Sequence, residues 1–256
     1  ENSLDGAPGV WVVSMGHFMG LFDQPFLGIA PTRKIAMLRY AEFNRVLDGK
    51  IVETALFCDL IHLMHQAGLT PLPPQTGQHL IQPGPRTHDG LMYDGAHDGS
   101  ETLALINRMI GDIQANSNSA ENEAPRDATP QAELALAWHD NMVWWGPDGI
   151  GATYTINRYV DQHQQPFRTQ LEDRAFHGHV ARLAEGNYGG FFGWANLSVT
   201  PIGGYMGLPK GPRAEMRVVD IYRREGDKLA ENWIFIDVLY FLKQQGLDVL
   251  ERLQTS

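Results

Sequence analysis

The feature that most constrains this chain is a repeat of one segment within its own 256 residues. Residues 39–69 and 217–247 align without a gap at an offset of 178, and most of the differences are conservative. Self-similarity of this kind marks a repeated structural unit, so the chain is interpreted as two related copies of one fold. The nine identities are Arg39/Arg217, Arg45/Arg223, Lys50/Lys228, Glu53/Glu231, Phe57/Phe235, Asp59/Asp237, Gln66/Gln244, Gly68/Gly246 and Leu69/Leu247.

Each copy of the repeat is typical of a β-hairpin followed by a short helix. Two apolar runs flank a polar turn that contains Asp and Gly, which is a strong hairpin signal. Asp59 and Asp237 then precede runs with helical apolar spacing, so we interpret both as helix N-caps rather than catalytic groups. A further strand is predicted ahead of each hairpin, over residues 10–15 and 190–195.

The second copy has a longer front half than the first. Residues 101–114 carry apolar side chains at helical spacing, and further helices are predicted over 130–138 and 155–167, with a short strand at 141–145. Helices followed by antiparallel strands indicate an α+β domain. The predicted domain organisation has three parts, which are the back half of a first domain (1–80), a linker (81–100) and a complete second domain (101–256).

Composition excludes several classes of function. The net charge of −10 lacks the basic footprint that nucleic-acid binding needs and disfavours attraction to anionic membranes. No apolar run approaches the roughly 20 residues of a membrane helix. Cys58 is the only cysteine, so disulfides within the chain and thiolate metal clusters are excluded. The expectation is a cytoplasmic protein in a reducing compartment.

The order of helices, hairpin and terminal helix resembles the SnoaL-like polyketide cyclase family, within the nuclear-transport-factor-two-like superfamily. Residues 28–34 read Gly-Ile-Ala-Pro-Thr-Arg-Lys and resemble the family's G-I-x-P-T-G-K loop, and residues 101–147 resemble its opening helices and V-x-x-G-P turn. The resemblance implies cone-shaped α+β barrels, each a curved antiparallel sheet wrapped by helices. The hairpins carry an apolar face with Ala55 and Phe57 in the first copy and Trp233 and Phe235 in the second, which predicts that the two sheets pack as an internal pseudo-dimer.

The resemblance also places the candidate chemistry. The family cyclase has its acid/base aspartate in a Glu-His-Trp-Asp run on the last strand, where this chain reads Glu231-Asn232-Trp233-Ile234. Since the aspartate position is apolar here, and is Leu56 in the first copy, the family mechanism does not carry over. Asp220 occupies the position of the family's pocket histidine. Strand alternation puts Asp220 and Asn232 on one face of the sheet. We predict Asp220 as the proton-transfer group and Asn232 as a holder of substrate oxygen; the alternative is an ion pair of Asp220 with Arg217 or Arg223.

Further candidates complete the predicted site. His139 is expected to end the second helix and assist catalysis. Candidate ligand-binding residues are Trp145, Trp194, Asn196 and Tyr222 in the second copy and His17 and Glu42 in the first. The His177-Gly178-His179 run could ligate a metal, but it lacks a third ligand in register and is interpreted as a surface segment. For the acid/base chemistry we expect neither a metal nor an organic cofactor.

The function hypotheses span two classes. The first is an enzyme that performs acid/base chemistry (cyclisation, isomerisation or elimination) on a small, cyclic or aromatic molecule; hydrolysis of an epoxide or ester is its variant. The second is a non-catalytic ligand-binding or assembly module of the same fold. An open pocket around Asp220 favours the first, and a cone filled by tryptophan favours the second. The partner hypotheses are a small-molecule ligand and either a homodimer or pairing with an upstream segment.

Overall fold

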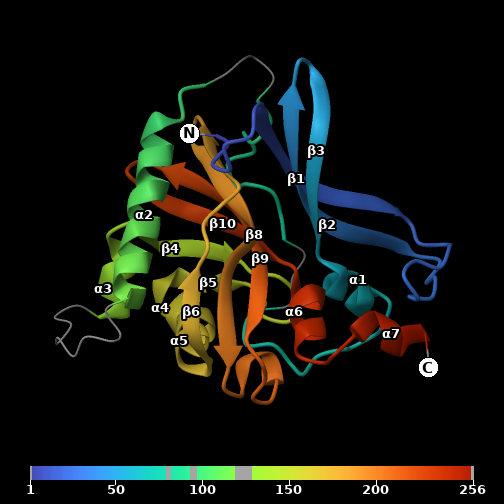
Figure 1. The fold of residues 1–256 in the computed structure, drawn as a ribbon. Helices are drawn as coiled ribbons and strands as arrows, with labels where there is room; N and C mark the ends of the chain where they lie inside the picture. The colour runs from blue at the N-terminus through green and yellow to red at the C-terminus, as the bar shows by residue number, and fades with distance from the viewer. Residues whose placement is uncertain (1, 79–81, 93–96, 119–128, 255–256) are drawn as a thin grey trace.

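The strands of this chain form two sheets that pack against each other (Figure 1). The computed structural model describes residues 2–78, 82–92, 97–118 and 129–254. The smaller sheet has the order β1-β2-β3, and the larger has the order β5-β4-β10-β9-β8-β6, with β7 pairing β8. All strand pairs are antiparallel except β4 with β10. The strands are β1 (Val10–Leu21), β2 (Ile35–Leu47), β3 (Lys50–Cys58), β4 (Trp138–Trp145), β5 (Thr153–Tyr154), β6 (Leu171–Phe176), β7 (Ala181–Glu185), β8 (Tyr188–Pro201), β9 (Ala214–Glu225) and β10 (Lys228–Ile236).

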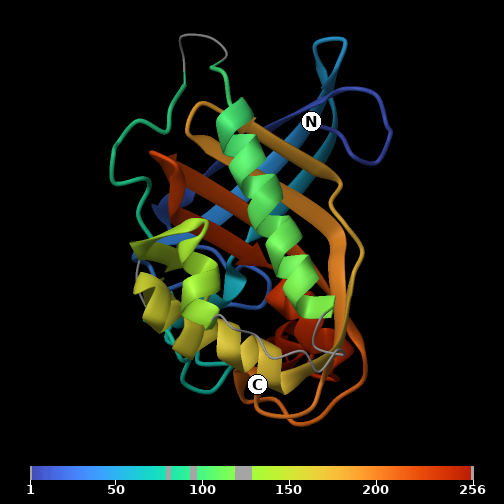
Figure 2. The same ribbon diagram turned by 90° about the vertical axis from the view of Figure 1, so that its left-hand side faces the viewer.

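The helices lie mainly on the side of the larger sheet that faces away from β1–β3 (Figure 2). The long helix α2 crosses that side, and its buried residues include Leu105, Ile106 and Met109. Together with α3, α4 and α5 it encloses one hydrophobic core, the interior of the cone. The helices are α1 (Leu60–Gln66), α2 (Ser100–Asn118), α3 (Pro130–Ala135), α4 (Thr155–Tyr159), the π-helix η2 (Val160–Gln164), α5 (Gln165–Gln170), the 3₁₀ turn η3 (Tyr205–Gly207), α6 (Val238–Gln244) and α7 (Val249–Gln254).

The other side of the larger sheet packs on the smaller sheet, as the pseudo-dimer prediction required. The four residues on which that prediction rested are buried, with exposed fractions of 8% or less. They belong to a second core that includes Phe43 and Phe192, whose ring centroids lie 4.7 Å apart. The four residues are Ala55, Phe57, Trp233 and Phe235.

Several residues that are identical in the two copies make equivalent contacts in both. Arg45 pairs with Glu53 across its hairpin, and Arg223 pairs with Glu231. The side chain of Gln66 bonds both backbone groups of Met37, as that of Gln244 does with Glu215.

Both aspartates are helix N-caps, as predicted. Asp59 accepts a hydrogen bond from the backbone N–H of His62 (3.2 Å), and Asp237 accepts one from Tyr240 (3.1 Å). These repeated residues therefore stabilise the hairpin–helix unit in each copy.

Several predicted elements have different bounds in the structure. The helix predicted over 130–138 ends at Ala135, because Trp138 enters β4 and aligns with Leu229 of β10. The helix predicted over 155–167 is three consecutive helical segments, α4, η2 and α5. The predicted boundary between the first domain and the linker falls within 79–81, outside the described residues.

Candidate functional site

The candidate site is the cone-facing side of the hairpin β9–β10. Alternation along the strands sends Val218, Tyr222 and Ile234 into the helix-covered core, and their neighbours Val219, Ile221, Trp233 and Phe235 into the inter-sheet core. Asp220 and Asn232 share the parity of the first set, so both lie in the cone. This placement agrees with the strand-parity prediction.

Asp220 is a carboxyl group held by neutral partners. It is 8% exposed, and the Nδ2 group of Asn232 donates a hydrogen bond to its Oδ1 at 3.0 Å. Burial raises the pKa of Asp220 to about 7, and the hydrogen bonds from Asn232 and Tyr222 offset part of that rise. The alternative ion pairs are absent, since Arg217 pairs with Asp237 and Arg223 with Glu225 and Glu231. Asp220 can therefore hold or release a proton near neutral pH.

The amide nitrogen of Asn232 makes two hydrogen bonds in the structure. Besides its bond to Asp220, Nδ2 donates to the carbonyl oxygen of Ile221 at 3.1 Å. Both hydrogens of an amide group are then used, so its predicted role as a holder of substrate oxygen competes with these bonds. In this arrangement Asn232 orients the carboxyl group of Asp220.

Aromatic rings fill the cone around this pair. The ring centroid of Tyr222 lies 5.8 Å from that of Trp138 and 6.0 Å from that of Phe191. The pKa of Tyr159 is raised well above its usual range, first by burial and then by the charge of Asp220. His163 stacks on Trp144 at 4.0 Å, and burial lowers its pKa to about 3, so this imidazole is neutral. The site is thus a carboxyl group among phenols and indoles.

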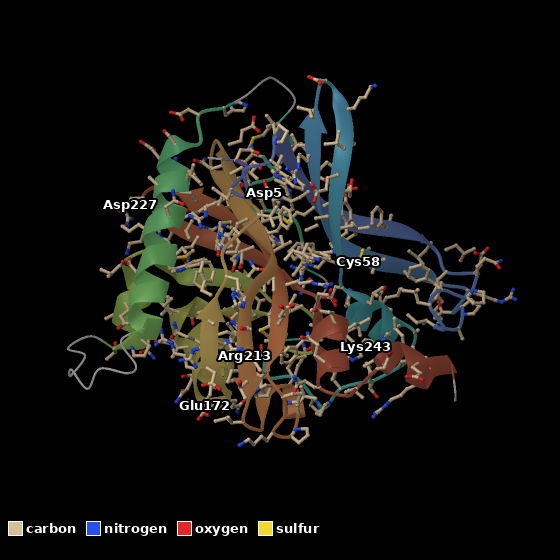
Figure 3. All side chains as sticks on the ribbon, in the orientation of Figure 1. Asp5, Cys58, Glu172, Arg213, Asp227 and Lys243 are labelled. Carbon is tan, nitrogen blue, oxygen red and sulfur yellow. The ribbon has the colours of Figure 1, made fainter. Side chains whose placement is uncertain are left out.

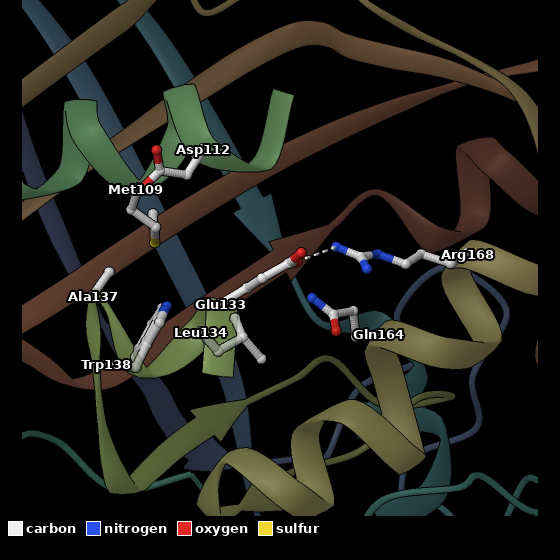
Figure 4. Close-up of a pocket in the computed structure, with 8 residues that line it drawn as sticks. All are labelled: Met109, Asp112, Glu133, Leu134, Ala137, Trp138, Gln164 and Arg168. Carbon is white, nitrogen blue, oxygen red and sulfur yellow. Dashed lines mark ion pairs between the residues drawn. The ribbon is translucent and has the colours of Figure 1, made fainter. Parts of the chain in front are cut away.

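A small cavity opens between the helices and the edge of the sheet (Figure 4). It encloses about 20 Å³, which is close to the space of one water molecule. Glu133 and Arg168 form an ion pair of 3.9 Å on its wall. Trp138 lines the cavity and also contacts Tyr222, whereas Asp220 is not among the lining residues. The ring of Trp138 therefore contacts both this cavity and Tyr222, which hydrogen-bonds Asp220.

The structure does not bring His139 to the site. The sequence prediction put it at a helix end, but it lies in β4, where pairing with β10 continues the sheet. Its Nε2 lies 2.7 Å from the carbonyl oxygen of Glu225, at the turn of the β9–β10 hairpin. His139 therefore contacts the hairpin turn, and assistance to Asp220 is not supported.

The predicted ligand-binding residues of the second copy are dispersed. Tyr222 lies in the cone beside Asp220, but Trp145 is buried in the inter-sheet core. Trp194 is 52% exposed and stacks on the guanidinium of Arg217 at 4.2 Å. Asn196 is buried, and its Oδ1 accepts a hydrogen bond from the backbone N–H of Val218 at 2.7 Å. Only Tyr222 has a position suited to contact with a ligand at Asp220.

In the first copy, His17 and Glu42 point to opposite faces of the smaller sheet. His17 lies opposite Arg39 on the face towards the larger sheet, where burial lowers its pKa. Glu42 lies opposite Leu56 on the other face. Strand alternation therefore prevents them from forming one site.

Sequence analysis missed a polar cluster at the junction of the two sheets. The Oδ2 atom of Asp59 accepts the backbone N–H of Asp148 at 2.9 Å and lies 3.8 Å from Nη1 of Arg39. Asp148 Oδ2 in turn lies 2.7 Å from Nδ1 of His65. These residues are 83 and 89 positions apart where they meet, so no local spacing in the sequence could signal the cluster.

The two histidines of the 177–179 run contact other protein groups rather than each other. His177 Nε2 lies 2.9 Å from Ser198 Oγ, while the ring of His179 stacks on Phe191 at 3.8 Å. Across the part of the chain that the structure describes, no group of three or more His, Cys, Asp or Glu side chains could hold a metal ion. None of the described helices has the length and apolarity to cross a lipid bilayer.

Comparison with known proteins finds likeness in structure only. No protein-family model and no curated protein matches the sequence. The chain is similar to TsrD from Streptomyces laurentii, with 17% identity and a TM-score of 0.42 over 56% of this chain and 96% of that one. It is also similar to an NTF2-like protein from Burkholderia xenovorans LB400 (12% identity, TM-score 0.40, 58% and 98%).

A third similar structure comes from Jannaschia sp. CCS1 and is described as a candidate SnoaL-like polyketide cyclase. It has 13% identity and a TM-score of 0.44, over 60% of this chain and 97% of that one. All three likenesses concern the fold, and each spans little more than half of this chain.

Proposed function

We propose that the cone formed by residues 100–256 binds a small cyclic or aromatic molecule and that Asp220 transfers a proton on it, without a cofactor. The observation that carries this proposal is the carboxyl group of Asp220, buried without a cationic partner in the described structure and with its pKa raised to about 7. A carboxyl group with such a pKa is present in both protonation states at neutral pH, which is what a general acid or base needs. Cyclisation, isomerisation and elimination all use such a group.

The division of roles follows from the contacts around Asp220. Asn232 orients the carboxyl group through its 3.0 Å hydrogen bond and acts as a positioning residue. The single O–H of Tyr222 is donated to Asp220, and the phenol of Tyr159 lies in electrostatic range of the same carboxyl group. We assign the contact with a substrate oxygen to Tyr159, because its phenol is not ionised near neutral pH and a neutral phenol can donate a hydrogen bond.

Access to Asp220 requires a side-chain movement. The described cavity is too small for a ring-containing ligand, and Trp138 contacts both it and Tyr222. We propose that a ligand enters along this wall and displaces the Trp138 ring, after which its flat face stacks where the indole had been. A planar aromatic molecule fits this exchange best.

The second candidate function is a non-catalytic module of the same fold. Two observations favour it: Asp220 does not line the described cavity, and aromatic side chains fill the cone. In that case Asp220 and Asn232 are a satisfied polar pair of the core. Hydrolysis of an epoxide or ester is the remaining variant, and it needs a water molecule activated by Asp220.

The test compares two aspartates. Cyclic ketones, phenols, epoxides and aryl esters are screened for a thermal shift, and each binder is assayed for turnover. Loss of a general acid/base lowers the rate by about 10²–10⁴, so Asp220→Asn should lose that much turnover while the fold remains. The matched control is Asp237→Asn, which changes an aspartate with an assigned capping role.

Four outcomes are decisive. Full turnover in Asp220→Asn, or a loss confined to Asp237→Asn, contradicts the proposal. Ligand binding without turnover, in the parent protein as well as in the variants, supports the non-catalytic module. A solvent-derived oxygen in the product supports the hydrolase.

A further inference from the structure

The side of the smaller sheet that faces away from the larger sheet carries exposed apolar side chains. We call this the outer face, and its apolar members Val10, Val12, Phe18 and Leu56 are 56%, 50%, 49% and 47% exposed. The alternate residues on the inner side, such as Phe43 and Phe57, are 0% and 4% exposed. Exposed apolar patches of this kind mark surfaces that bind another element.

The outer face corresponds, position by position, to the cone-facing side of β9–β10. Glu42 lies opposite Leu56 across the β2–β3 hairpin, as Asp220 lies opposite Ile234 across β9–β10. Ile234 is 7% exposed, against 47% for Leu56. The two hairpins differ on this side because a helical layer covers only one of them.

The second copy shows what covers this kind of face. The layer runs from α2 to α5 and precedes the strands β6–β10 in the chain (Figure 2). Helix α2 of this layer is amphipathic, with Leu105, Ile106, Met109 and Ile110 buried against the sheet. Among the described residues, no helix occupies the equivalent place over the outer face (Figure 1).

The register fixes where such a layer would join the first copy. Trp11 pairs with Arg45 in the smaller sheet, as Tyr188 pairs with Arg223 in the larger. Residues 100–187 of the second copy therefore correspond to chain ahead of Trp11.

We propose that the outer face is one wall of a second cone, completed by an amphipathic helical segment of the same kind as residues 100–187 and joined to the chain ahead of β1. The segment covers Val12, Phe18 and Leu56 and encloses Glu42 as α2–α5 enclose Asp220. The protein then has two cones back to back, each with a carboxyl group at the equivalent strand position.

A second copy of this chain is a poorer occupant of the outer face. A two-fold contact would bring the two Glu42 carboxylates towards each other, between chains that each carry a net charge of −10. Thr54 and Asn44, which share the face, bond each other and supply no positive charge. Homodimerisation through this face is therefore an outcome of the test rather than the proposal.

The first experiment uses the chain's own helical layer as the probe. Residues 100–187 are joined directly to Trp11 in place of residues 1–10, and a thiol is placed on the outer face by Thr54→Cys in a Cys58→Ser background. Alkylation of this thiol should be about tenfold slower or more in the extended chain than in residues 1–256. A matched thiol at Asp227→Cys, on the exposed turn of the other hairpin (Figure 3), should react equally in both.

Equal alkylation of Thr54→Cys in both chains, with circular dichroism showing the added helix, overturns the proposal. Two measurements remain decisive even if the extended chain does not fold. The intact mass of the native protein should exceed 28.6 kDa, and a native mass equal to that of these 256 residues contradicts the joined segment.

The second measurement uses residues 1–256 alone, where the outer face should be open. Leu56→Asp should then leave the melting temperature and the monomeric state unchanged and lower the binding of an apolar dye. A dimer that Leu56→Asp dissociates would show that a second copy covers the face. Neither result depends on the role of Asp220, so this proposal and the proposed function fail separately.

Discussion

The hairpins β2–β3 and β9–β10 share their turn, their cross-strand ion pair and their capped helix, yet the described residues cover both faces of β9–β10 only. Leu56 and Ile234 occupy equivalent positions in the two hairpins, but Leu56 is 47% exposed and Ile234 is 7% exposed. The carboxyl groups beside them follow the same division, since Asp220 is buried in the cone and Glu42 lies on the open face. The difference shows that the chemistry of a strand position depends on the layer packed over it, because desolvation is what raises a carboxyl pKa.

The largest expected effect tests the part that the two hairpins have in common, the inter-sheet core. Phe57→Ala and Phe235→Ala should each lower the free energy of unfolding by about 3–5 kcal/mol, because both rings are buried. Urea unfolding of the two variants measures it. A cost below about 1 kcal/mol for Phe57→Ala would mean that the sheets do not pack in solution as they do in the structure.

The next comparison tests the face on which the hairpins differ. Ile234→Ala should cost about 2–5 kcal/mol, since it opens a cavity in the cone. Leu56→Ala, at the equivalent position, should change the free energy of unfolding by no more than about 0.5 kcal/mol, as exposed positions do. Equal costs in urea unfolding of residues 1–256 would contradict the open outer face.

The buried carboxyl group predicts a specific dependence of stability on pH. Asp220 keeps its proton in the folded state up to about pH 7 but loses it near pH 4 when unfolded, so stability should fall as pH rises between these values. The full effect of a shift of about 3 units is at most roughly 4 kcal/mol.

Asp220→Asn removes this titration and should therefore be stabilised relative to the parent protein as pH rises from 4 to 7. Urea unfolding at four or five pH values measures the difference between the two proteins. Parallel pH profiles of parent and variant would show that Asp220 does not have a raised pKa.

The smallest effect concerns the two helix caps. Asp237→Ala should cost about 1 kcal/mol, the usual loss for a cap. Asp59→Ala should cost more, because Asp59 is 6% exposed and its Oδ2 atom also accepts a hydrogen bond from the backbone N–H of Asp148. Thermal or urea unfolding of the two variants checks the order, and an equal cost would show that the hydrogen bond between Asp148 and Asp59 adds nothing to the cap.

Sequence analysis identified the hairpins and caps because their determinants are local. A turn, an N-cap and a cross-strand pair depend on residues within about ten positions, and strand alternation follows from backbone geometry. These rules sufficed to place Asp220 and Asn232 together. They failed for His139, which was expected at the end of a helix. It lies in strand β4 instead, because β4 pairs in parallel with β10, about 90 residues further along the chain.

What the sequence by itself determined is therefore the repeated hairpin–helix unit and the faces of its strands, which put Asp220 and Asn232 on one side of the hairpin. Only the tertiary structure decided that Trp145 belongs to the inter-sheet core, that Trp194 is exposed, and that Asp148 meets Asp59 and His65. The physical reason is how far apart in the chain the interacting residues lie. Alternation and capping act between neighbours in the chain, whereas burial and its effect on pKa are set by distant segments that pack over a face.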